Sequence, residues 1–403
     1  MIEIKMDLLQ TIGLAGLSLI VGYWLKKRWL KRLTIPAAVI GGLIFAIINT
    51  IFYQLGIGYI TVNTGLNDFF MVLYFTTIGL GASIKNSRGL GKSIVMLLGL
   101  TIIAIFVQNF VAVGIGKMFG VDSLVALMMG SPALVGGPGC VAAIAPAVEK
   151  MGYSQAMTAG MISATIGISA GGLLAGPIGS RIIERHKLST MTNAKTYEQE
   201  AAKSDKDSAI MGKTDVFNTM MIILVCMFFG SFITRAINSF MGIFMDNISF
   251  PVVLGPMILG FVFRYISDKK ENDLVSVDGV DVVADVSLDL FLGLTIINLQ
   301  FWTIFEIAVP MIVILVAGII ITLLFAYFII YYAMGRNYDA AVMSAGFVGY
   351  GCGTTSNAMS GMREVTNKYG PSPKSFLTTS IICGVFLDFA NVLLVFITMG
   401  LLN

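Results

Sequence analysis

The sequence predicts an all-α integral membrane protein with ten transmembrane helices, arranged as two inverted five-helix repeats that each carry a re-entrant hairpin. Three observations support this fold class. Of the 403 residues, 56% are hydrophobic and only 12% are charged, whereas soluble domains contain about 25% charged residues. Two glycine-rich apolar segments occur, at 131–146 and 344–359. Short matches between the two halves recur at a nearly constant offset.

Apolar stretches of about 20 residues, the length that crosses a bilayer core, recur along the chain. The first has its basic residues after it and no small-residue cleavage site, so we expect a retained helix rather than a signal peptide. A hydrophilic stretch of mixed charge at 184–214 is expected to be a linker between a first repeat, 1–183, and a second, 215–403. The expected spans are residues 7–25, 35–55, 68–84, 93–117, 153–182, 216–241, 249–266, 284–303, 305–334 and 374–401.

The positions of Lys and Arg predict the orientation, because cytoplasmic connections carry an excess of these residues. If the amino terminus is outside, 22 of the 26 fall in inner connections and only Lys5, Lys117, Lys150 and Arg235 remain outside. We therefore expect a multi-pass protein of the cell (inner) membrane with both termini outside and a cytoplasmic linker. The net charge of +3 is too small to indicate a nucleic-acid partner.

Four matches in the same order indicate that the two halves are repeats. Five spans per half is an odd number, so the second half enters the membrane from the opposite side. Inverted repeats of this kind are typical of secondary transporters, whose binding site lies near the bilayer midplane. The matches pair Ile35-Pro36 with Phe250-Pro251, Phe75 with Phe291, Asp122 with Asp339, and Lys150 with Lys368, at offsets of 215 to 218.

The glycine-rich segments are expected to be re-entrant hairpins near 122–150 and 339–368. Each is about 30 residues long, too short for two full crossings, and backbone of this kind is tolerated at depth where it lines a cavity. Free amides and helix starts at the tips favour an anion, especially a carboxylate. The alternative is glycine for tight helix crossing. The predicted substrate-binding residues are Ser131, Gly136, Gly137, Gly139 and Cys140 in the first segment, and Gly351, Gly353, Thr354, Thr355, Ser356 and Asn357 in the second.

Oxygen ligands for a coupling cation are expected in two spans. Asp388 and Asn391 stand three residues apart in the last span, and Asn109 follows Gln108 in the middle of the fourth. A deep acid requires a partner, most simply an ion or a proton. We predict a coupling cation at Asp388, Asn391 and Asn109, with Thr76 and Thr77 as further ligands. The alternatives are proton coupling and an acid satisfied by neighbouring amides.

Other polar residues have simpler interpretations. Asp122 and Asp339 start their segments and are expected to be helix N-caps, whereas Asp289 could line an ion path. His186, the single histidine, is expected to be solvated in the linker. Without a histidine in any span the chain lacks the groups of an enzyme active site, so we predict no enzyme and no cofactor apart from the coupling ion. An anion channel is the alternative from another class.

Seven stretches, spread over nearly the full length of the chain, match one protein family in the same order: TIPAAVIGGLI (34–44), YFTTIGLGASI (74–84), QN (108–109), VSLDLFLGL (286–294), MGRNYDAAVMSAG (334–346), KYGPS (368–372) and DFAN (388–391). In these stretches the chain resembles the bacterial sodium/glutamate symporter family. The resemblance implies ten helices, two re-entrant hairpins, a homodimer and an elevator motion that brings glutamate inward with sodium. It also implies that the cation at Asp388, Asn391 and Asn109 is sodium.

The departures from the family lie where substrate selectivity is expected. The first tip of the family reads GGHGT, and residues 136–140 read GGPGC; the second reads GATPT, and residues 353–357 read GTTSN. Asp289 stands where family members carry serine. L-glutamate is the first expected substrate. A related acidic amino acid, or a di- or hydroxycarboxylate moved with protons or sodium, is the alternative.

Overall fold

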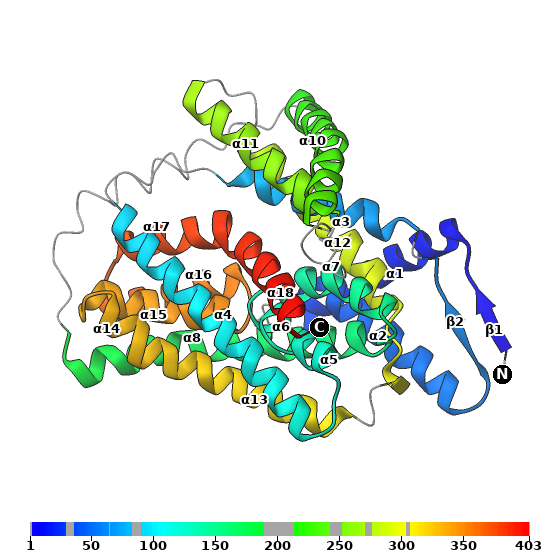
Figure 1. Ribbon diagram of the computed structural model, residues 1–403, viewed down its shortest axis with the longest axis horizontal. Helices are drawn as coiled ribbons and strands as arrows, with labels where there is room; N and C mark the ends of the chain where they lie inside the picture. The colour runs from blue at the N-terminus through cyan, green and yellow to red at the C-terminus, as the bar shows by residue number, and fades with distance from the viewer. Residues whose placement is uncertain are drawn as a thin grey trace.

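A computed structural model describes residues 2–29, 36–63, 65–82, 90–188, 213–241, 252–270, 276–303 and 307–402. Helices make up nearly all of this structure (Figure 1). Two short strands that the sequence did not predict, β1 (Ile2–Lys5) and β2 (Gly58–Thr61), pair in parallel with Ile2 opposite Gly58. This pairing fixes the chain before the first helix against the turn after the second.

Six of the described helices are long and apolar enough to cross a membrane, and they match six of the ten expected spans. A bent pair, α17 (Pro373–Ile381) and α18 (Asp388–Leu402), makes a seventh. The chain is therefore a multi-pass membrane protein. The six are α1 (Leu8–Arg28), α2 (Ala37–Gln54), α4 (Gly91–Met118), α8 (Ala156–His186), α10 (Lys213–Met241), and α13 (Ala308–Leu324) with its continuation through η4 (Phe325–Ile330) and α14 (Tyr331–Ala333).

The other three expected spans are helices that do not meet the same length and hydropathy test. They are α3 (Asn67–Gly81), α11 (Leu254–Lys270) and α12 (Val277–Ile297). The first two are 15 and 17 residues long, and α12 carries several aspartates. The predicted linker falls mostly on residues 189–212, which lie outside the described residues, and its first three residues continue α8.

One group of helices contains α1, α2, α3, α10, α11 and α12, which pack against one another. Glycines permit the closest crossings. A Cβ on Gly22 of α1 would overlap the Ala37 carbonyl of α2, and a Cβ on Gly255 of α11 would overlap the Gly230 carbonyl of α10. Small residues of this kind let helix backbones approach closely inside a membrane.

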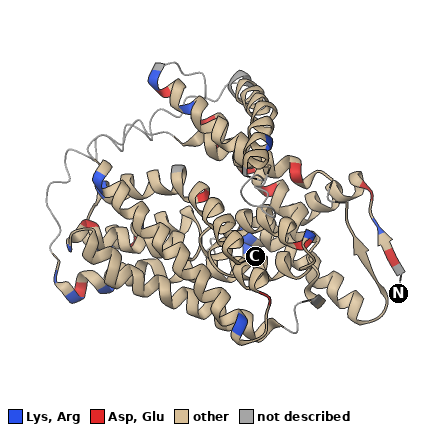
Figure 2. Cartoon of the chain, viewed as in Figure 1, with Lys and Arg blue, Asp and Glu red and all other residues tan. Residues whose placement is uncertain are grey.

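A second group contains α4, α8, α13, α17, α18 and the two hairpins between them. In Figure 1 this group occupies the lower left, whereas α10 and α11 lie at the top. α8 packs along the second hairpin. A Cβ on Gly167 would lie 2.8 Å from the Cys352 carbonyl oxygen, and a Cβ on Gly171 would lie 3.0 Å from the Gly349 carbonyl oxygen. Figure 2 shows that Lys and Arg lie mainly near the ends of the helices.

Candidate functional site

The first hairpin consists of α5 (Ser123–Met128), α6 (Ser131–Leu134) and α7 (Gly137–Lys150). Asp122 caps its first helix as predicted, because its Oδ1 accepts a hydrogen bond of 2.9 Å from the Leu124 amide. The chain reverses at Gly136 and Gly137, and Gly137 has a φ of +63°. Glycine adopts this left-handed conformation without the steric cost of a Cβ, so the tip requires it there.

The second hairpin consists of α15 (Tyr338–Gly351) and α16 (Thr355–Tyr369), joined by a short turn. Thr354 caps α16, since its Oγ1 accepts from the Asn357 amide at 3.3 Å. The predicted N-cap at Asp339 is wrong. Asn337 caps α15 instead, accepting from the Ala340 amide at 2.9 Å, while Asp339 lies in the first turn of the helix and accepts from the Ser372 hydroxyl at 2.6 Å.

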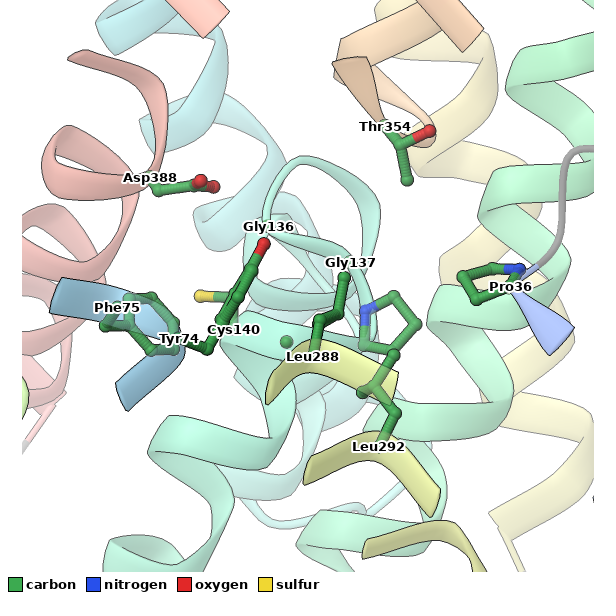
Figure 3. A pocket seen from close by; sticks show the side chains of 12 residues that line it. Pro36, Tyr74, Phe75, Gly136, Gly137, Cys140, Leu288, Leu292, Thr354 and Asp388 are labelled. Carbon is green, nitrogen blue, oxygen red and sulfur yellow. The ribbon is translucent and has the colours of Figure 1, made fainter. Parts of the chain in front are cut away.

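The two hairpin tips meet inside the protein. A Cβ on Gly137 would lie 3.5 Å from the carbonyl oxygen of Gly353, and both glycines are buried. Beside this contact lies a cavity of about 70 Å³, lined by both helix groups (Figure 3). Its lining residues are Pro36, Tyr74, Phe75, Gly136, Gly137, Pro138, Gly139, Cys140, Leu288, Leu292, Thr354 and Asp388.

Asp388 is the one formally charged residue among those that line the cavity. It begins α18 directly after a π-helical segment, η5 (Ile382–Leu387). The two halves of this last span are bent by 48° at that segment. π-helical turns inside helices are frequent at functional sites, and here the irregular turn precedes the carboxylate that faces the first tip.

Two of the predicted sodium ligands converge on the first hairpin. Asn391 Oδ1 accepts from the Ser131 hydroxyl at 2.8 Å, and its Nδ2 donates to Cys140 Sγ at 3.4 Å. Asn109 Oδ1 accepts from the Ser131 amide at 2.9 Å. All three of Asn109, Ser131 and Asn391 are fully buried. The structure thus gathers these residues behind the tip, where each amide oxygen already accepts one hydrogen bond.

Thr76 and Thr77 do not line the cavity, although the preceding two residues of α3 do. Both are buried, and their hydroxyls donate back to their own helix, to the Val72 and Tyr74 carbonyls, each at 2.6 Å. Each oxygen retains lone pairs, but neither points to the site that Asp388 faces. Their role as sodium ligands stays a prediction.

The second tip contributes fewer cavity residues than predicted. Thr354 lines the cavity and Gly353 faces Gly137, but Thr355 and Ser356 are exposed. Asn357 is fully buried and donates through Nδ2 to the Ile168 carbonyl of α8 at 2.7 Å. The carbonyl of Gly351 accepts from Gln108 Nε2 at 3.0 Å. These last two residues therefore fix the hairpin in place.

The sequence reasoning missed the apolar wall of the cavity. Tyr74 and Phe75 come from α3, and Leu288 and Leu292 from α12. A signal was present, because Phe75 belongs to one of the matched pairs and its partner lies between the two leucines. Pro36, another lining residue, belongs to a second matched pair. Taken alone, however, such matches indicate a repeat and do not indicate a cavity wall.

Two further expectations concern residues outside the cavity. His186 was expected to be solvated in the linker, and this is wrong: it ends α8 half-buried, with its ring centroid 4.7 Å from that of Tyr331. Asp289 is half-buried, accepts a hydrogen bond from the Tyr23 hydroxyl of α1, and is not among the residues lining the cavity. A place for it on an ion path stays a prediction.

A multi-pass membrane protein in which the tips of two hairpins meet beside a small internal cavity has features expected of a membrane transporter. The comparison with protein families agrees. The chain belongs to the sodium/glutamate symporter family, whose model matches residues 4–371. This is a family of transporters and not of enzymes.

Individual relatives cover nearly the whole chain. It is 31% identical to the sodium/glutamate symporter of Escherichia coli over 408 aligned positions, covering 97% of this chain and 96% of that protein. It is 29% identical to the sodium/glutamate symporter of Haemophilus influenzae, covering 98% and 97%. Among solved structures, a sodium–proton antiporter from Methanocaldococcus jannaschii covers 98% of both chains at 14% identity, with a TM-score of 0.44 that is too low to establish a common fold.

Proposed function

We propose that this protein is a secondary active transporter that takes up L-glutamate together with sodium by alternating access. The observation that carries the proposal is the contact between Gly137 and Gly353 beside Asp388. The cavity at this contact has backbone amides and one carboxylate, but no basic side chain among its lining residues. The relatives in Escherichia coli and Haemophilus influenzae are named for the same substrate and ion.

The substrate carboxylate is held by the tips. α7 begins at Gly137 and α16 at Thr355, so two helix amino termini lie at the meeting point. Each carries the positive end of a helix dipole and unpaired amides, which favour an anion without a basic side chain. Of the predicted substrate residues, Gly136, Gly137, Gly139, Cys140 and Thr354 line the cavity.

Sodium balances the charge of the occupied site. An anionic substrate beside the Asp388 carboxylate would be repelled in a medium of low dielectric constant, and a bound cation removes the repulsion. Asp388 is the primary ligand in this proposal, with Asn391 and Asn109 close behind the first tip. An intramembrane acid with no basic partner among the residues lining its cavity fits an ion or proton site.

The proposed fold of the protein has ten transmembrane helices in two inverted repeats, at 1–183 and 215–403, joined by a cytoplasmic linker at 184–214. Paired close contacts support it. Gly42 of α2 abuts Ile296 of α12, and Gly260 of α11 abuts the Thr76 carbonyl of α3. In both cases the second helix of one half meets the third helix of the other half. Gly42 and Gly260 are 218 residues apart, within the range of the sequence offsets.

The motion proposed is an elevator. The group of α1–α3 and α10–α12 would be the fixed scaffold, and the group containing both hairpins would carry the cavity across the membrane. The division of contacts into two groups supports this assignment. We expect a homodimer in the cell (inner) membrane with both termini outside, which the distribution of basic residues favours.

Uptake of labelled glutamate into proteoliposomes tests the function. We expect accumulation with an imposed inward sodium gradient and none with a proton gradient alone. Accumulation driven by protons alone would contradict sodium coupling. Unlabelled aspartate, malate and citrate added as competitors define the substrate class, because the altered tips at Pro138 and Thr354 border the cavity. Stronger inhibition by a di- or hydroxycarboxylate than by glutamate would contradict the proposed substrate.

A further inference from the structure

Two adjacent side chains on α4 contact both hairpins. We propose that Gln108 and Asn109 form a brace that fixes the two tips relative to each other, so that the substrate site is preassembled and moves as one unit. In the brace both act as positioning residues, and for Asn109 this role is additional to its place at the proposed sodium site. The expected effect of the brace on transport rests on the proposed function. The brace itself concerns only the distance between the two hairpins.

Gln108 holds the second hairpin. Its Nε2 donates to the Gly351 carbonyl at 3.0 Å and to Thr322 Oγ1 of α13 at 2.8 Å. Gly351 is the last residue of α15 before the turn, where helix carbonyls lack intrahelical partners. The side chain is 2% exposed. The bond therefore fixes the backbone of the tip itself, at its entry into the turn.

Asn109 holds the first hairpin. Its Oδ1 accepts from the Ser131 amide at 2.9 Å, at the start of the short helix that precedes the tip. The Ser131 hydroxyl in turn donates to Asn391 of α18 at 2.8 Å. A Cβ on Gly130 would lie 3.0 Å from the same Oδ1, so this hairpin lies directly against α4. The contact anchors the first hairpin five residues before Gly136.

Consecutive residues of a helix point about 100° apart and differ in height by about 1.5 Å. From one point on α4 the two amides therefore reach two different neighbours. α4 runs unbroken from Gly91 to Met118, which gives both bonds a common rigid support. Both bonds are buried, where water does not compete for them and the local dielectric constant is low.

Each amide also leaves one buried atom without a partner among the described residues, namely Gln108 Oε1 and Asn109 Nδ2. Burying an unpaired polar atom is unfavourable. A side chain present only to fill this space would be more stable as leucine or methionine. The amides are therefore explained by the bonds that they make to the two hairpins.

The brace matters because the two glycine tips do not hold each other in place. A Cβ added to Gly137 would still lie 3.5 Å from the Gly353 oxygen, an ordinary van der Waals distance, so the native glycine leaves space between the tips. A site held in its binding geometry avoids the entropic cost of ordering at the moment of binding. Loss of either bond would allow a range of tip separations, and substrate affinity would fall.

The test uses Gln108→Met and Asn109→Leu, which keep the side-chain size and remove the hydrogen bonds. Spin labels on cysteines introduced at Lys150 and Ser360, both exposed and one on each hairpin, report the separation of the hairpins without substrate. The four native cysteines are buried and serve as the unlabelled background. Glutamate affinity is measured in the same proteins.

The matched control is Thr101→Val. This variant also removes a buried hydrogen bond between α4 and the second hairpin, the 2.8 Å contact of Thr101 with the Tyr350 hydroxyl. Thr101 lies two helical turns from Gln108 along α4, and its bond reaches the tyrosine side chain and not the backbone of the tip. We expect both brace variants to broaden the label distances and to weaken glutamate binding about tenfold, the effect of losing one bond of this kind. The control should keep both the distances and the affinity of the unaltered protein.

Narrow, unaltered distances in both brace variants would overturn the proposal, whatever the affinity. Equal broadening in Thr101→Val would also overturn it, because any lost contact of α4 would then suffice. If the unaltered protein fails to bind glutamate, the proposed substrate is wrong, and the label distances still decide whether the brace exists.

Discussion

At the scale of single residues, the first tip tolerates no side chain at one glycine and accepts one at another. A Cβ on Gly136 would overlap the side chains of Cys140 and Asn391, whereas one on Gly139 would meet Tyr74 at 3.5 Å, an ordinary contact. We therefore expect Gly136→Ala to weaken glutamate binding at least about tenfold through displacement of the tip. Gly139→Ala should change it much less. Equal affinities in a binding assay would contradict the geometry of the tip.

In the proposed mechanism, sodium coupling depends on Asp388. Asp388→Asn keeps the size of the side chain and removes its charge, so we expect glutamate binding to lose its dependence on sodium while the protein still folds. The measurement is glutamate affinity as a function of sodium concentration. Asp285→Asn is the control, because Asp285 is an exposed aspartate of α12 that is not among the residues lining the cavity. A sodium dependence that survives in Asp388→Asn would refute the assignment.

The sequence predicted half of the residue-scale site. Glycines at a deep turn and an acid in the last span have few structural explanations, so Gly136, Gly137 and Asp388 could be identified from residue type and position. The direction of Asn357 and Thr76 could not, because it depends on the rotation of each helix about its axis. Thr76 turns its hydroxyl to the Val72 carbonyl of its own helix, and Asn357 turns its Nδ2 to the Ile168 carbonyl of α8.

At the scale of elements, the hairpins were predictable and the break in the last span was not. The helix pairs at 123–150 and 338–369 agree closely with the expected ranges, because a segment of about 30 residues is too short for two crossings. Their entry from opposite faces of the membrane stays a prediction. The π-helical turn at Ile382–Leu387 contains no proline, the usual marker of a bent helix. Its single glycine, Gly384, is too weak a signal to place a bend beside Asp388.

Helix crossing provides a stability test at this scale. Gly16 and Gly22 both lie in α1. A Cβ on Gly22 would overlap the Ala37 carbonyl, whereas a Cβ on Gly16 would have nothing within 4 Å. We expect Gly22→Leu to reduce the free energy of unfolding by about 1–3 kcal/mol or more through overpacking. Gly16→Leu should leave it nearly unchanged. Thermal unfolding in detergent compares the two, and equal melting temperatures would contradict the crossing.

At the scale of the whole molecule, the cavity lies where two groups of helices meet. Tyr74, Leu288 and Leu292 come from one group, and the hairpin tips and Asp388 from the other. The sequence could not predict this division, because it depends on contacts between segments more than 170 residues apart. α3 with α11 and α3 with α12 are the clearest cases. A substrate held between the groups would be released when one moves past the other.

The most direct test of the account asks whether both tips close on one substrate. Single cysteines at Pro138 and Thr354, in a protein with Cys140→Ser, are labelled by a small thiol reagent with and without glutamate and sodium. The account predicts that glutamate slows labelling at both positions, and only when sodium is present. Protection at one position alone, or protection without sodium, would contradict a site formed by both hairpins and completed by the ion.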